Sequence, residues 1–209
     1  PRVTASESNV YVVWTASDDI FFAASNDTGA TFSEPVNLSS DDTPSASASV
    51  VASGSNVYVM WVDGDSSSAD IKIVVSNNAG NTFSDVITLI DDGPSSDPRI
   101  ATSGSNVYVA WKANVGNNEI FFAASNDTGA TFSSPVNLSA NTGSSVDPAI
   151  AVDGTNVHVA WADSTPTSRG IQVASSNNGG TSFESGPAVL NVDDFFVRLP
   201  VVAVSPTSG

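Results

Sequence analysis

Short runs of β-branched and aromatic residues, separated by Gly, Asn, Asp and Ser, follow one another along the whole chain. The strongest run reads Asn-Val-Tyr-Val-x-Trp and occupies residues 9–14, 56–61, 106–111 and 156–161, with His158 in place of Tyr in the last copy. β-propensity and turn chemistry both predict short strands here. Since apolar residues nowhere recur at i, i+3 and i+4, almost no helix is expected.

Each strong run is preceded by one apolar run and followed by two more, so that units start near residues 1, 48, 98 and 148. A period near 50 with four strands per unit is typical of a β-propeller blade. A single four-stranded meander has two apolar faces and must stack on neighbours. We therefore predict one all-β domain over residues 1–209, a β-propeller of antiparallel blades at about 1–47, 48–97, 98–147 and 148–199.

Residues 200–204 repeat the opening strand of a unit and are expected to form a surplus strand. Three arrangements are open: a fragment of a larger propeller, a ring of four blades with a tail, or a strand that inserts into a neighbouring molecule.

An octapeptide of the form Ser-x-(Asp/Asn)-x-Gly-x-(Thr/Ser)-Phe occurs once per unit, before the last strand. It resembles the Asp box, or BNR repeat, of sialidase-like propellers. The matching residues are Ser25, Asp27, Gly29, Thr31 and Phe32; Ser76, Asn78, Gly80, Thr82 and Phe83; Ser125, Asp127, Gly129, Thr131 and Phe132; and Ser176, Asn178, Gly180 and Phe183.

Turn chemistry explains each position of this octapeptide. Gly can adopt positive φ, the Asp or Asn oxygen can accept backbone N–H groups, and the terminal Phe is expected to enter the core of its blade. The resemblance implies that the octapeptide is a folding device, on the face away from the usual binding site. The recurring Tyr and Trp residues, and His158 in a Tyr position, are likewise expected to pack between blades.

Composition excludes several classes of function. A formal charge of −16, from 22 acidic and 6 basic residues, repels nucleic acid. No apolar run reaches the ~18 residues of a membrane span, so no membrane insertion is expected. Without cysteine the chain has no thiolate site. Because its one histidine, His158, stands in the repeated Tyr position, neither a histidine-based catalytic triad nor a zinc site is expected.

The resemblance to sialidases raises glycoside hydrolysis as an activity. Those enzymes use three arginines, a Tyr–Glu pair and an Asp acid/base. Here the arginines are Arg2, Arg99, Arg169 and Arg198, and every Tyr lies in the repeated strand position. Because that set of roles is incomplete, we predict a chain without catalytic activity.

Most length variation falls in the loops at 15–19, 62–70, 112–119 and 162–170 and in residues 193–198, where ligand contacts are expected on a rigid scaffold. Lys112, Arg169 and Arg198 are the candidate ligand-binding residues. The alternative is that these loops vary in sequence without any role in binding. Asp63, Asp65 and Asp70 offer oxygen ligands for Ca²⁺, or belong to a solvated acidic loop. Asn26, Asn37, Asn126 and Asn137 lie in Asn-x-Ser/Thr sequons, of which Asn37 and Asn137 are the candidate glycosylation sites.

Together these features favour a non-catalytic propeller, extracellular or on the cell surface. Its expected role is to bind a protein or glycan at the variable loops, or to self-assemble through residues 200–204. The alternative is a divergent glycoside hydrolase or a glycan-binding lectin.

Overall fold

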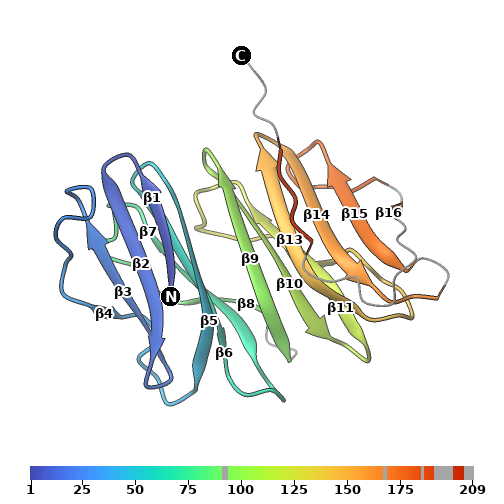
Figure 1. Ribbon diagram of the computed structural model, residues 1–209, viewed down its shortest axis with the longest axis horizontal. Helices are drawn as coiled ribbons and strands as arrows, with labels where there is room; N and C mark the ends of the chain where they lie inside the picture. The colour runs from blue at the N-terminus through green and yellow to red at the C-terminus, as the bar shows by residue number, and fades with distance from the viewer. Residues whose placement is uncertain (91–93, 167–168, 185, 191–199, 205–209) are drawn as a thin grey trace. The chain divides into compact units, whose positions relative to one another are not determined.

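The computed structural model describes residues 1–90, 94–166, 169–184, 186–190 and 200–204, and these residues form sixteen strands (Figure 1). The strands are β1 (Arg2–Ser6), β2 (Asn9–Ala16), β3 (Asp19–Ser25), β4 (Val36–Asn37), β5 (Ser45–Ser53), β6 (Asn56–Asp63), β7 (Asp70–Ser76), β8 (Ile87–Ile90), β9 (Ser95–Ser103), β10 (Asn106–Asn114), β11 (Asn118–Ser125), β12 (Val136–Asn137), β13 (Ser145–Asp153), β14 (Asn156–Asp163), β15 (Gly170–Ser176) and β16 (Ala188–Leu190). None of the described residues belongs to a helix, and hence none to a helix able to cross a membrane.

Each set of four consecutive strands forms one antiparallel sheet, which we call blades 1 to 4 in chain order. The predicted all-β fold of four-stranded meanders is confirmed. The chain divides into two compact units, Pro1–Ile100 and Ala101–Gly209. Blades 1 and 2 belong to the first unit and blades 3 and 4 to the second, with the boundary inside β9.

The innermost strands β5, β9 and β13 begin at residues 45, 95 and 145, ahead of the predicted boundaries at 48, 98 and 148. A β-bulge explains the difference. The register shifts between Ala46 and Ser49 and between Val146 and Ala149. Ser47 and Asp147 take φ values of 55° and 56° within these bulges. Because a bulge breaks the apolar alternation, the start of the strand is hidden in the sequence.

The outermost strands are shorter than their sequence runs. β12 contains only Val136 and Asn137, since Pro135 cannot donate to a ladder. Serine side chains complete the pairing instead: the Oγ atoms of Ser39 and Ser33 accept the backbone N–H groups of Ile20 and Ala24 at 2.9 and 3.1 Å. Ser139 and Ser133 repeat both bonds in blade 3.

The core of each unit lies between its two blades. In the first unit, Tyr11 and Phe22 of blade 1 pack with Val57 and Trp61 of blade 2. The second unit repeats this cluster with Tyr108, Phe122, Val157 and Trp161. Tyr11, Trp61, Tyr108 and Trp161 therefore fill the space between the two blades of their unit.

Residues 200–204 belong to none of the four sheets. The structure thus gives the proposed surplus strand no partner among the described residues, and self-assembly through it stays a prediction.

Candidate functional site

The octapeptides, called boxes 1 to 4 below, are turns closed by their own side chains. In box 1, Asp27 Oδ1 accepts the Ser25 hydroxyl at 2.7 Å and the Thr31 amide at 2.9 Å, and Oδ2 accepts the Thr31 hydroxyl at 2.6 Å. The Gly29 amide donates to Ser25 Oγ at 2.9 Å. Side chains and amides within the box therefore close this turn.

Asparagine preserves the same turn with one bond reversed. Asn78 Oδ1 still accepts the Thr82 amide at 3.0 Å, while Asn78 Nδ2 donates to Thr82 Oγ1 at 2.8 Å. The threonine hydroxyl changes from donor to acceptor, which explains why boxes 2 and 4 tolerate the loss of a carboxylate. In box 1, bonds from Thr31 and Ser25 lower the pKa of Asp27 to about 2.

The terminal Phe of boxes 2 and 4 packs against the cluster between the two blades of its unit, and not within its own blade alone as we expected. The Phe83 ring of box 2 lies edge-on against Phe22 of blade 1, with centroids 4.9 Å apart. Phe183 of box 4 meets Phe122 of blade 3 in the same way, at 5.0 Å. Phe32 of box 1 is 46% exposed. Boxes 2 and 4 therefore also hold one blade against the preceding one.

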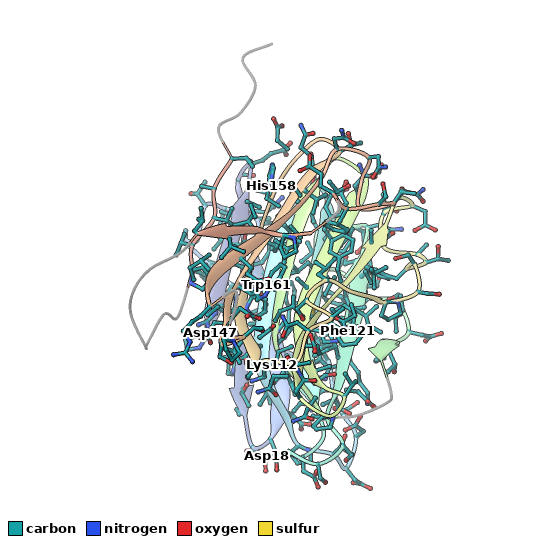
Figure 2. All side chains as sticks on the ribbon, turned by 90° about the vertical axis from the view of Figure 1, so that its right-hand side faces the viewer. Asp18, Lys112, Phe121, Asp147, His158 and Trp161 are labelled. Atoms are coloured by element: carbon teal, nitrogen blue, oxygen red, sulfur yellow. The ribbon has the colours of Figure 1, made fainter. Side chains whose placement is uncertain are left out.

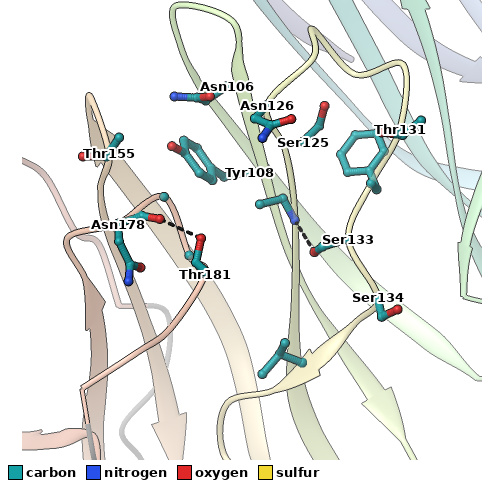
Figure 3. A pocket seen from close by; sticks show the side chains of 15 residues that line it. Asn106, Tyr108, Ser125, Asn126, Thr131, Ser133, Ser134, Thr155, Asn178 and Thr181 are labelled. Atoms are coloured by element: carbon teal, nitrogen blue, oxygen red, sulfur yellow. Dashed lines mark hydrogen bonds between the residues drawn. The ribbon is translucent and has the colours of Figure 1, made fainter.

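A cleft of about 570 Å³ opens between boxes 3 and 4 in the second unit (Figure 3). Strand β10, the two boxes, the chain after box 3 and the β13–β14 turn enclose it. Its lining residues are Asn106, Tyr108, Ala124, Ser125, Asn126, Thr131, Phe132, Ser133, Ser134, Val136, Thr155, Asn178, Gly179, Gly180 and Thr181. All of these side chains are uncharged, and most carry a hydroxyl or an amide.

Hydrogen bonds fix the walls of this cleft. The buried Tyr108 donates its hydroxyl across the blades to the Gly154 carbonyl at 3.2 Å, and burial raises the pKa of this phenol. Thr155 Oγ1 donates to the Asn177 carbonyl at 3.1 Å, and the Gly179 amide donates to the Thr155 carbonyl at 2.8 Å. The cleft is thus preformed, with amide and hydroxyl groups at fixed places.

Sequence reasoning missed this cleft, because we expected the boxes to face away from a binding site. One signal was present. Boxes 1, 2 and 4 are followed within two residues by Glu34, Asp85 and Glu184, whereas box 3 is followed by Ser133 and Ser134. No acidic residue is therefore among those that line the cleft. In the first unit, a cavity of about 330 Å³ lies at a different place, between β4 and the chain after box 2, and Asp85 lines it.

The predicted cationic residues are not brought to this cleft. Lys112 lies within β10, opposite Ile120 of β11, because that strand continues past Trp111 to Asn114. Figure 2 places Lys112 and His158 toward opposite ends of the second unit. Arg169 is half-buried beside the start of β15, and Arg198 lies outside the described residues.

The proposed Ca²⁺ ligands do not form a metal site. Asp63 is buried and engaged by Lys72 Nζ at 2.5 Å. Asp65 Oδ1 instead accepts the Ser67 amide at 2.7 Å, and bonds from Ser67 lower the pKa of Asp65. Asp70 lies opposite Asp63 in the β6–β7 register. Over the described part of the chain, no three His, Asp or Glu side chains are grouped to hold a metal ion.

His158 packs at a strand position, as expected, with Nδ1 2.9 Å from Ser175 Oγ. Glu119 is buried and accepts hydrogen bonds from Ser139 and Asn117, so its carboxylate stabilises blade 3. Arg2 is exposed at the start of blade 1, and Arg99 is half-buried in β9. These residues lie outside the cleft.

No protein-family model matches the chain, and no curated protein sequence matches it. Solved structures do. The chain is similar to the Penicillium chrysogenum α-L-arabinanase complexed with arabinobiose, with 14% identity over 100% of this chain and 71% of that chain, and a TM-score of 0.60. It is also similar to the GH93 α-L-arabinofuranosidase of Fusarium graminearum, with 11% identity over 89% and 65% of the two chains and a TM-score of 0.58.

A third structure, the PL25 ulvan lyase bound to -[GlcA(1-4)Rha3S]-, has a TM-score of 0.63 and 14% identity. The match covers 92% of this chain but only 55% of the lyase. These neighbours are β-propellers. The chain has a β-propeller fold. At such low identity the similarity establishes the fold alone.

Proposed function

We propose that this chain is a non-catalytic, carbohydrate-binding β-propeller module, and that a neutral sugar binds in the cleft between boxes 3 and 4. The observation that carries the proposal is the uncharged, hydroxyl- and amide-rich lining of that cleft. Its volume of about 570 Å³ is within the ~300–1,000 Å³ typical of small-molecule sites.

The chemistry of the lining suits a sugar. Sugar hydroxyls both donate and accept hydrogen bonds, and Asn106, Asn126 and Thr155 offer groups of both kinds. The half-buried Phe132 ring provides an apolar surface for the C–H face of a pyranose or furanose. A charged ligand would find no opposite charge among the lining residues.

Three neighbours support the choice of ligand class without fixing it. The Penicillium and Fusarium structures hold arabinobiose, and the lyase holds an oligosaccharide. Propellers of this shape thus serve as scaffolds for sugar recognition. The cleft differs in position from our sequence-based expectation, in which the variable loops make the ligand contacts.

The absence of catalysis is part of the proposal. Glycoside hydrolysis generally needs two carboxyl groups that flank the scissile bond. The cleft lining contains no Asp or Glu. We accordingly infer binding without turnover, and an extracellular or cell-surface location, which the acidic composition favours.

The finer family assignment belongs to this proposal as well. We place the chain with the Asp-box, sialidase-like propellers because all four boxes fold as side-chain-closed turns. In boxes 1 and 3, the Oδ1 atoms of Asp27 and Asp127 each accept the backbone amide four residues further on. In boxes 2 and 4, the Oδ1 atoms of Asn78 and Asn178 accept the equivalent amide.

The test is calorimetric titration of the chain, made without glycans in a bacterial cytoplasm, with a panel of neutral arabino-, xylo- and gluco-oligosaccharides. We expect binding by at least one member. Asn106→Ala should weaken it about tenfold, since a lost polar contact costs ~1–1.5 kcal/mol.

The matched control is Asn9→Ala, which changes the equivalent residue of the first unit. It should leave the affinity unchanged. Lack of binding by every sugar at millimolar concentration, or an equal loss in the two variants, would contradict the proposal.

A further inference from the structure

The four Asn-x-Ser/Thr sequons form two pairs related by the repeat, and the structure treats the pairs differently. Asn26 and Asn126 occupy the second position of boxes 1 and 3, in Asn-Asp-Thr. Asn37 and Asn137 lie on the outermost strands β4 and β12, in Asn-Leu-Ser. Sequence alone does not separate these pairs.

The pair on the outer strands is built into the fold. Asn37 Nδ2 donates to Asp19 Oδ2 at 2.8 Å, and Asn37 Oδ1 accepts the Ser39 amide at 3.1 Å. The Ser39 side chain is 4% exposed, and its hydroxyl caps the Ile20 amide. A glycan on Asn37 would compete with these bonds.

Asn137 is held similarly. Its Oδ1 accepts the amides of Ser139 and Ala140 at 3.1 and 2.9 Å. Ser139 is 9% exposed and caps Ile120. Both candidate sites named from the sequence therefore carry structural bonds, and the structure does not favour them as acceptors.

The pair in the boxes is accessible. Asn26 and Asn126 are exposed, and no described residue forms a hydrogen bond with either side-chain amide. The turn is closed by Ser25, Asp27 and Thr31 and by their counterparts in box 3, not by these asparagines. A group attached to either Nδ2 would break no bond of the fold.

We propose that Asn26 and Asn126 are the N-glycan acceptors of this protein and that Asn37 and Asn137 are not. The donor is a lipid-pyrophosphate-linked oligosaccharide. Nδ2 forms a bond to sugar C1 and loses one proton, while the C1–O bond breaks and the lipid pyrophosphate leaves with the electron pair. Thr28 and Thr128 supply the hydroxyl that the sequon requires.

Boxes 2 and 4 provide internal controls. Asn77 and Asn177 occupy the same turn position, but Ala79 and Gly179 replace the threonine, so neither is a sequon. Ala79 and Thr28 have φ values of 58° and 60°, which means that this backbone accepts alanine in blade 2. Thr28→Ala and Thr128→Ala should therefore remove both acceptors without loss of the fold.

The chain is expressed in yeast with a secretion signal at its N-terminus. Protein is collected both from the cell membranes and from the medium, and both fractions are analysed. Peptide mapping after enzymatic deglycosylation in heavy-oxygen water marks each asparagine that carried a glycan. Asn26 and Asn126 should be marked in the parent chain and unmarked in Thr28→Ala/Thr128→Ala. Ala79→Thr creates a sequon in blade 2 and should add a mark at Asn77.

Marks at Asn37 or Asn137, or unmarked Asn26 and Asn126 in protein that has reached the medium, would overturn the inference. It does not depend on the proposed sugar binding, which is tested on unglycosylated protein. Asn126 also lines the cleft, so a glycan attached to Asn126 would extend from the edge of the cleft (Figure 3).

Discussion

The two units bury an aspartate at the same place in the repeat but stabilise it by different means. In the first unit, Asp63 is 4% exposed and contacts Lys72 Nζ at 2.5 Å, while Lys72 also contacts Asp41 at 3.3 Å. The hydroxyls of Ser45 and Thr43 donate to the same carboxylate at 2.8 and 3.0 Å. Burial lowers the pKa of Lys72, but the two carboxylates outweigh it and leave this pKa raised.

In the second unit, Asp163 is 5% exposed and accepts three bonds from neutral donors. These are Asn141 Nδ2, Ser145 Oγ and the Thr165 amide, each at 2.8 Å. Gln172 stands at the position of Lys72, and Asn141 at that of Asp41. Loss of the cation and loss of its second carboxylate therefore go together. The buried carboxylate is thus stabilised by a counter-charge with two hydroxyl donors in the first unit and by three neutral donors in the second.

The largest effect is expected from Lys72→Gln. It leaves Asp63 buried without its cation and should lower the free energy of unfolding of the first unit by about 3 kcal/mol. Urea denaturation combined with hydrogen-exchange mass spectrometry will locate the loss. Adding Asp41→Asn completes the neutral set found in the second unit and should recover part of the stability. If Lys72→Gln alone is harmless, the ion pair is not what stabilises Asp63.

A smaller effect is expected where a box glycine touches the preceding blade. A Cβ on Gly80 would lie 2.6 Å from the Phe22 ring, and one on Gly180 would come still closer to the Phe122 ring. Gly80→Ala and Gly180→Ala should each cost about 2–4 kcal/mol, from overpacking together with alanine at positive φ.

Gly29→Ala is the matched control for these two variants. Its φ is 90°, and its Cβ would meet only Val10, at 3.8 Å. Gly29→Ala should lower the free energy of unfolding by the cost of backbone strain alone, about 1 kcal/mol. Equal losses in all three variants, measured by thermal unfolding, would show that backbone strain rather than contact between blades explains the cost.

The smallest effect concerns pH and separates boxes with Asp from boxes with Asn. Hydrogen bonds lower the pKa of Asp27 and of Asp127 from 3.8 to about 2. Because the folded-state pKa is the lower one, the stabilisation is present above pH 3.8 and is lost as the pH falls toward 2.

Asp27→Asn with Asp127→Asn copies boxes 2 and 4 and should flatten the pH dependence of unfolding over this window. Urea denaturation at several pH values between 2 and 4 measures this pH dependence of the free energy of unfolding. An unchanged slope would mean that these carboxylates are not the groups that titrate.

Repetition made the strands and turns predictable. Asn-Val-Tyr-Val-x-Trp and the octapeptide each contain the residues that determine their own local structure, such as Ser25, Asp27 and Thr31 in one closed turn. The contacts between blades were harder to predict, since Phe22 packs against Phe83 of the next blade along the chain. The sequence indicated this contact at one place. The same position of the third strand holds Phe in blades 1 and 3 and an aliphatic residue in blades 2 and 4, in the order Phe22, Ile73, Phe122 and Val173.

The cleft was missed for the same reason. It depends on boxes 3 and 4 lying side by side, and no local pattern encodes that distance. The bulges at Ser47 and Asp147 were hidden because positive φ at a residue other than glycine leaves no mark in apolar periodicity.

The serine hydroxyls beside the outermost strands affect how readily two molecules can pair through their sheet edges. A bare strand edge offers amides that template the strand of another chain, which is the usual route to sheet-to-sheet aggregation. In blades 1 and 3, Ser33, Ser39, Ser133 and Ser139 already accept the amides of the third strand where the short fourth strand falls away. Replacing these hydroxyls would leave the amides without an acceptor at the strand edge, and we expect such variants to pair edge to edge more readily.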